Sequence, residues 1–197
     1  MEEYKISILD LTCKASVSFS KNCCTNNKLL LLGGRNNYIS CLYFDFPLYL
    51  CIKHLISAKL ILFKYPTIKY FCQEERGYSE EFGYHGYYSV SPLLEFFSMQ
   101  SCQYPLPKTD FDKNIKFINT VYLCYTEIDI TDIVTEWLDD TLENKGLMLT
   151  GGKNIGLISF ASEKDDNPGM RPMIRLIFKE NPCWEGFSST PCVVKVK

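Results

Sequence analysis

The fold class of this chain is decided by residues 127–179, EIDITDIVTEWLDDTLENKGLMLTGGKNIGLISFASEKDDNPGMRPMIRLIFK. Polar and apolar residues alternate from Asp129 to Thr131, as expected for a strand with one buried face. A helical pattern follows and ends at Asn144-Lys145-Gly146, residues that tolerate turn dihedrals. The stretch therefore predicts a strand, one short helix, two strands, a turn and a final strand.

The predicted helix covers residues 132–138. Thr131 stands at the N-cap position, where its hydroxyl can accept a hydrogen bond from a free backbone N–H, and Asp132 complements the helix dipole. One apolar face, which must pack on a sheet, is formed by Ile133, Val134, Trp137 and Leu138. We expect Trp137 to lie in the core; the alternative is a platform that stacks on sugar rings.

A hairpin turn is predicted at residues 164–169, flanked by Glu163 and Arg171. A bidentate Glu–Arg contact across its mouth would fix the register of the hairpin. The alternative is a calcium site, because hard cations prefer clustered oxygens. Its ligands would be Asp165, Asp166 and Asn167.

Several positions in this stretch match a known family in the correct order: Asp129, Thr131, Val134, Trp137, Asn144, Gly146, Leu147, Ser162, Glu163, Arg171, Pro172 and Ile174. Earlier matches are Leu30–Gly33, Leu42–Asp45 and Ile56–Leu62. In these motifs the chain resembles the DNRLRE-type domains, which are related to disaggregatase and overlap a family of carbohydrate-binding modules. The resemblance implies an all-β, jelly-roll-like antiparallel β-sandwich over residues 13–179, without a catalytic centre or cofactor. It also implies that Asp129, Thr131, Trp137, Glu163 and Arg171 belong to the scaffold.

Length and charge exclude several classes of protein. A chain of 197 residues is long enough for one substantial core. The 21 basic and 23 acidic residues are mixed along the chain, which argues against a nucleic-acid partner. No apolar run reaches the length of a membrane span. The opening residues, MEEYKISILD, lack the features of a classical signal peptide.

The chain contains ten cysteines, none of them in a C-x-x-C pair, which argues against a zinc ribbon or a thioredoxin-like site. Cys41 and Cys124 lie in predicted strands and are expected to be buried. Candidates for cross-links between subunits are Cys13, Cys23, Cys24, Cys183 and Cys192. The alternative is that all are reduced and inert. Many cysteines without an export signal suggest an extracellular, spore-surface or cell-surface protein that is released by lysis of the cell that made it.

An aromatic segment, FGYHGYY at residues 82–88, departs from the family pattern. Gly83 and Gly86 predict a loop that presents Tyr84, Tyr87 and Tyr88. These rings could stack on sugars, pack beneath a loop or form a subunit contact. Neither histidine, His54 or His85, has an evident partner for metal binding or catalysis.

Two strand-like tails flank the family-like region, at residues 1–12 and 180–197. Their strand-forming residues are Tyr4, Ile6, Ile8, Val193, Val194 and Val196. A tail strand can close a sheet edge in its own molecule. Between molecules it would be a donated strand, which builds a head-to-tail polymer of the chain with itself.

These observations favour a non-enzymatic structural subunit of an extracellular or spore-surface fibre, assembled by strand exchange and cross-links. The alternative is a carbohydrate-binding module for a cell-surface or acidic polysaccharide. An enzyme is disfavoured, because the carboxylate pairs are typical of solvated faces and no histidine accompanies a nucleophile. Those pairs are Glu74-Glu75, Glu80-Glu81 and Asp139-Asp140.

Overall fold

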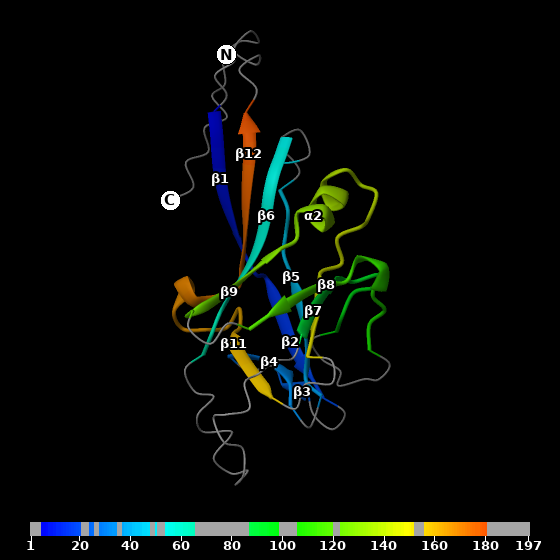
Figure 1. The fold of residues 1–197 in the computed structure, drawn as a ribbon, viewed down its shortest axis with the longest axis vertical. Helices are drawn as coiled ribbons and strands as arrows, with labels where there is room; N and C mark the ends of the chain where they lie inside the picture. Colours follow the sequence, from blue (N-terminus) through cyan, green and yellow to red (C-terminus); the bar gives the residue numbers. More distant parts are fainter. Residues whose placement is uncertain are drawn as a thin grey trace.

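The computed structural model describes residues 5–20, 24–25, 28–34, 37–47, 50, 54–65, 87–98, 106–119, 123–151 and 156–180. Within these ranges the chain forms antiparallel β-sheets and one α-helix (Figure 1). The predicted all-β, sandwich-like class is therefore confirmed.

The described strands form three sheets. The four-stranded sheet has the order β1 (Lys5–Thr12), β12 (Met173–Glu180), β6 (His54–Phe63) and β9 (Tyr125–Asp129). The six-stranded sheet has the order β3 (Cys24–Thr25), β2 (Ala15–Phe19), β5 (Ile39–Tyr43), β10 (Leu147–Thr150), β7 (Tyr87–Pro92) and β8 (Ile115–Ile118). The two-stranded sheet pairs β11 (Leu157–Ala161) with β4 (Leu29–Gly33), and a bridge from Lys64 to Phe160 connects it to the end of β6.

The main core lies where the four-stranded and two-stranded sheets meet the six-stranded sheet. Fully buried side chains come from all three, for example Leu60 of β6, Leu32 of β4 and Leu149 of β10. The helix α2 (Thr131–Leu138) covers this core with four buried residues, Ile133, Val134, Trp137 and Leu138. Burial of a leucine-sized side chain contributes about 1.5–3 kcal/mol, so this shared core holds the sheets together.

Two buried serines join β4 to the six-stranded sheet. The Ser18 hydroxyl accepts a hydrogen bond from the Leu31 N–H at 3.0 Å, and the Ser40 hydroxyl donates to the Leu31 carbonyl at 2.9 Å. The two hydroxyl oxygens lie 2.8 Å apart. Side-chain hydroxyls thus satisfy backbone groups of β4 that would otherwise be buried without partners.

Alternation along the chain explains which face each strand buries. In β12 the buried residues are Ile174, Leu176 and Phe178, while Arg175 and Lys179 point to the other face. The alternating sequence of residues 15–19 forms β2, and the leucine run at residues 29–32 forms β4. Alternation extends over residues 38–46, but β5 covers only Ile39–Tyr43. β6 begins at His54, ahead of the strand-like sequence of residues 57–63.

Thr131 anchors the helix in a way that differs from the prediction. It is the first residue of α2, and its hydroxyl does not cap the helix. Instead the hydroxyl accepts a hydrogen bond from the Ala58 N–H of β6 at 3.0 Å and donates to the Asp129 carboxylate at 2.6 Å. The Ile130 N–H donates to the Ala58 carbonyl at 2.9 Å. The helix entry is therefore fixed to β6, because the pairing of β9 with β6 brings Asp129 beside this strand.

Residues 5–12 belong to the four-stranded sheet and do not form a free tail. All eight residues of β1 pair antiparallel with β12, from Lys5 opposite Glu180 to Thr12 opposite Met173. In Figure 1, β1, β12 and β6 run side by side and extend beyond α2. Of the two possibilities open for this segment, closure of an edge within the same molecule is the one seen here.

Candidate interaction surface

The outer face of the four-stranded sheet, which points away from the core, carries exposed apolar side chains near β1. Ile6 is 54% exposed and Ile8 is 64% exposed. Ile177 of β12 lies directly opposite Ile8 and is only half-buried. Exposed isoleucines that adjoin across strands form a small apolar patch, a feature typical of contact surfaces. Of the residues predicted to take part in strand exchange, Ile6 and Ile8 lie within the described part of the chain.

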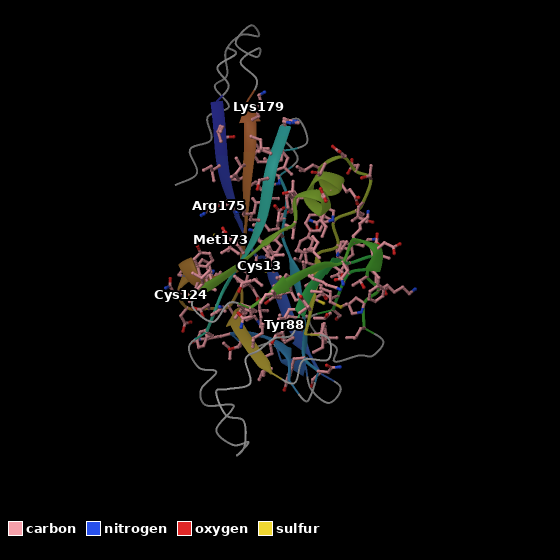
Figure 2. All side chains as sticks on the ribbon, viewed as in Figure 1. Cys13, Tyr88, Cys124, Met173, Arg175 and Lys179 are labelled. Carbon is pink, nitrogen blue, oxygen red and sulfur yellow. The ribbon has the colours of Figure 1, made fainter. Side chains whose placement is uncertain are left out.

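An ion pair lies beside this apolar patch. Arg175 of β12 donates from Nε to Asp10 Oδ1 at 2.9 Å and from a terminal nitrogen to Asp10 Oδ2 at 3.0 Å. The hydrogen bonds and charge of Asp10 raise the pKa of Arg175. Figure 2 shows Lys179, Arg175 and Met173 in succession along β12. The single carboxylate on the outer face of β1 is thus neutralised within its own molecule.

The tyrosines predicted to form a binding loop separate into different environments. Tyr87 and Tyr88 belong to strand β7 and point to opposite faces of the sheet. Tyr88 is 1% exposed and stacks against Phe117 with ring centroids 5.8 Å apart, so its assignment to a glycan-binding face is wrong. Tyr88 is labelled in Figure 2. Tyr84 lies outside the described residues.

Tyr87 remains a candidate for ligand contact. Its side chain is 64% exposed, and Ile118, also exposed, lies directly opposite on β8. Lys116 Nζ lies 5.9 Å from the centre of the Tyr87 ring. On the same face, the hydroxyl groups of Ser89 and Thr150 form a hydrogen bond, with their oxygens 2.9 Å apart. An exposed ring beside a cation and hydroxyl groups is a surface on which a polar ring could stack.

The described cysteines differ from the predictions in two cases. Cys13, predicted as a cross-link, is buried, and burial together with the charge of Glu163 raises the pKa of its thiol to about 12. Such a thiol is inert in the folded protein. Cys41 is buried as expected, and burial raises the pKa of its thiol. Cys124, expected to be buried, is exposed at a bend before β9.

Other cross-link candidates are not placed by the structure. Cys24 lies in β3, and nothing is described of its side chain. Several predicted residues lie outside the described ranges: Cys23, Cys183, Cys192, Tyr4, Val193, Val194, Val196 and His85.

The hairpin at residues 162–171 is held by contacts other than the predicted one. Within the described part of the chain, Glu163 does not pair with Arg171. The Ser16 hydroxyl donates to the Glu163 carboxylate, and Arg171 Nε donates to the Asp165 carbonyl at 3.0 Å. Glu163 is bonded to Ser16 instead, because the fold brings β2 within hydrogen-bond distance of the hairpin. The assignment of both residues to the scaffold stays a prediction.

The acidic turn uses its oxygens internally. Asp165 Oδ1 accepts from the Asn167 N–H at 2.9 Å, and Asn167 Oδ1 accepts from the Gly169 N–H at 3.0 Å. Asp166 forms an ion pair with Lys28. No group of metal-binding side chains is found among the described residues. The turn is therefore held by its own hydrogen bonds, and the ion pair with Lys28 connects it to the residue that precedes β4.

Trp137 occupies the core. It is 6% exposed and packs edge-on against Phe46, with ring centroids 5.4 Å apart. The core assignment is therefore confirmed, and the sugar-stacking alternative for this residue is excluded by burial. Of the carboxylate pairs, Asp139 and Asp140 are exposed after α2, as predicted, while the two glutamate pairs lie outside the described residues.

Neither the models of known protein families nor the curated protein sequences match this chain. The likeness to DNRLRE-type domains accordingly stays a prediction that rests on the residues quoted for it. Among the described residues, no helix is long and apolar enough to span a membrane.

Proposed function

We propose that this protein is a non-enzymatic structural subunit that assembles with copies of itself into an extracellular or spore-surface fibre. The observation that carries the proposal is the apolar patch of Ile6, Ile8 and Ile177 on the outer face of the four-stranded sheet. Exposed apolar side chains gain free energy when a second protein surface removes them from water. The neighbouring Asp10–Arg175 pair adds no unbalanced charge that would repel a second copy.

Self-association can be tested with two matched substitutions. Ile6 and Ile118 are both 54% exposed, but Ile6 lies in the patch and Ile118 lies on β8. We expect Ile6→Lys to weaken association by about tenfold or more, because burying an ammonium group is unfavourable. Ile118→Lys should associate like the wild type.

The measurement is light scattering coupled to gel filtration over a wide range of protein concentration, with reductant present to remove disulfides. Electron microscopy of the concentrated sample examines whether fibres form. A wild-type chain that stays monomeric at every concentration would refute the proposal. Equal loss of association in both lysine variants would show that the patch is not the contact.

Tyr87 supports a second candidate, a carbohydrate-binding module. Its exposed ring lies beside Lys116, which suits an acidic polysaccharide better than a neutral one. In titration calorimetry with an acidic polysaccharide, Tyr87→Ala should abolish the heat of binding, whereas Tyr125→Ala, which removes a 38% exposed ring on β9, should not. If the wild type shows no heat of binding with the polysaccharide, the proposal of a carbohydrate-binding module is refuted.

A further inference from the structure

The free edge of β1 is the longest uncovered strand edge in the described part of the chain. β1 has eight residues, ends its sheet and pairs with β12 on one side. No described strand pairs with its other side. An edge strand of this length is usually protected by a charge, a proline or a bulge, because it can otherwise pair with another chain. The outward-facing side chains near the start of β1 are instead Ile6 and Ile8.

Three of the other sheet edges carry such protection. The outward residues of β9 include the carboxylates Glu127 and Asp129. β8 has only four residues, and its outward residues include Lys116. The edge of β4 is covered by the hydroxyls of Ser18 and Ser40. Compared with these three edges, β1 has the fewest features that would prevent pairing with a strand of another molecule.

Hydrogen bonding at the end of β1 shows which backbone groups face outward. The Cys13 N–H donates to the Pro172 carbonyl at 2.8 Å, which continues the β1–β12 register. The Lys14 N–H points the other way and donates to Tyr43. In an antiparallel pair, the residues that exchange hydrogen bonds alternate along the strand. Odd-numbered residues of β1 therefore bond to β12, and even-numbered residues direct their N–H and C=O groups to the free edge.

The outward-directed residues are Ile6, Ile8, Asp10 and Thr12, the same residues whose side chains are exposed. They offer four N–H and four C=O groups in an extended row. Asp10 is the only one with a charge, and Arg175 holds that charge through two hydrogen bonds. A partner for this row needs an extended edge of its own with matching spacing and no repelling charge. A second copy of β1 supplies one.

We propose that two copies of the chain pair antiparallel through β1 around a two-fold axis. This rests on the proposed self-assembly and specifies its contact. A two-fold axis makes one surface complementary to itself, and an axis perpendicular to the strands makes the two copies of β1 antiparallel. The result is a continuous eight-stranded sheet, β9–β6–β12–β1 followed by the same strands in reverse order.

The register follows from the outward groups. All four outward residues find partners only if Ile8 lies opposite Asp10 of the partner subunit and Ile6 lies opposite Thr12 of the partner subunit. This register also avoids placing the two Asp10 carboxylates directly opposite each other, which would be unfavourable. A two-fold contact closes as a pair, so growth of a fibre needs a second contact elsewhere on the molecule.

Amide hydrogen exchange by NMR tests the pairing residue by residue. In dilute, monomeric protein, the N–H groups of Ile6, Ile8, Asp10 and Thr12 should exchange fast and those of Ser7, Leu9 and Leu11 slowly. At concentrations where the protein associates, we expect exchange of the even-numbered amides to slow by about tenfold or more. Exchange of β1 between molecules predicts a different result, because the odd-numbered amides would bond to β12 of the partner and the even-numbered amides would stay exposed.

Ile8→Pro and Ile8→Ala form a matched pair for light scattering. Proline removes the outward N–H and is tolerated at a strand edge, whereas alanine keeps the N–H and removes the apolar side chain. Ile8→Pro should raise the dissociation constant more than Ile8→Ala, with thermal unfolding used to verify that both variants fold. A folded Ile8→Pro variant that associates like Ile8→Ala would overturn the edge pairing.

The outcomes separate the two proposals. Association with protected even-numbered amides supports the β1 contact. Association with unprotected even-numbered amides overturns this contact and leaves self-assembly standing. A wild-type chain that never associates overturns both.

Discussion

Replacement of Thr131 by valine would test whether one hydroxyl fixes the helix to the sheet. Valine keeps the branched shape of threonine and a similar helix propensity, so the substitution removes little besides the hydroxyl. Two hydrogen bonds disappear, one from the Ala58 N–H and one to Asp129. Ala58 is fully buried, so its N–H loses its acceptor in the folded protein.

The expected loss follows from the unpaired group. A buried N–H left without a partner costs about 1–3 kcal/mol. For a chain of this length, each kcal/mol lowers the melting temperature by about 2–4 °C. Thr131→Val should therefore unfold about 2–12 °C below the wild type. Tryptophan fluorescence can follow unfolding both on heating, which gives the melting temperature, and in urea, which gives the unfolding free energy, because Trp137 lies in the same helix and is buried.

Thr135→Val is the matched control. Its hydroxyl donates to the Thr131 carbonyl at 2.9 Å inside the helix, and the side chain is exposed. Its unfolding free energy should change by no more than about 0.5 kcal/mol. If both variants lose the same stability, or if Thr131→Val loses none, the cross-sheet hydrogen bond does not stabilise the fold as argued.

Three further predictions concern neighbouring or contrasting residues. Tyr88→Ala should lower the unfolding free energy by about 3–5 kcal/mol, as for other buried aromatics, while Tyr87→Ala should change it by no more than about 0.5 kcal/mol in the same urea titration. Iodoacetamide should modify Cys124 but not Cys13 in the folded protein, as measured by peptide mass spectrometry; equal labelling would contradict the burial of Cys13. The thiol of Cys13 has its pKa raised from 9.0 to about 12 in the folded state, so its contribution to stability is complete below pH 9 and is lost as the pH rises toward 12. By pH 10 this thiol should account for about 1.4 kcal/mol of lost stability, and Cys13→Ala should show a correspondingly shallower alkaline decline.

Local alternation made much of the fold predictable. The strands at residues 15–19 and 173–180 follow the period of two that a half-buried strand requires, and the strand at residues 29–33 is a short apolar run that ends at a glycine. The amphipathic pattern likewise placed the short helix to within one residue. These elements are fixed by residues close together in the sequence, which explains why the sequence alone revealed them.

Contacts between residues far apart in the sequence could not be predicted from local alternation or helical periodicity. The acceptor for Ala58 is Thr131, and the partner of Glu163 is Ser16, each far away along the chain. Both side chains were expected to bond locally, because local geometry permits it. Only the arrangement of the sheets decides which partner each one meets.

The exposure of Tyr88 and of Cys124 was predicted wrongly for a different reason. Tyr88 was assigned to a loop because of the glycines before it, although Tyr88 and Val90 alternate with Ser89 and Ser91 as in a strand. For Cys124, the alternation of β9 extended backward would place it on the buried face. The bend at residues 123–124 turns the thiol outward instead.

The antiparallel register of β1 and β12 determines how the molecule responds to force. Lys5 lies opposite Glu180, so the chain enters β1 and leaves β12 at the same end of the sheet. A pull applied at these two residues would peel the strands apart one pair at a time, which is the mechanically weak direction for a sheet. A pull along the strand axis, applied to β1 at one end and to β6 at the other, would load the hydrogen bonds on both sides of β12 together. The four-stranded sheet should therefore resist a force directed along its strands from β1 to β6. It should yield more easily to a force applied at Lys5 and Glu180, which separates β1 from β12.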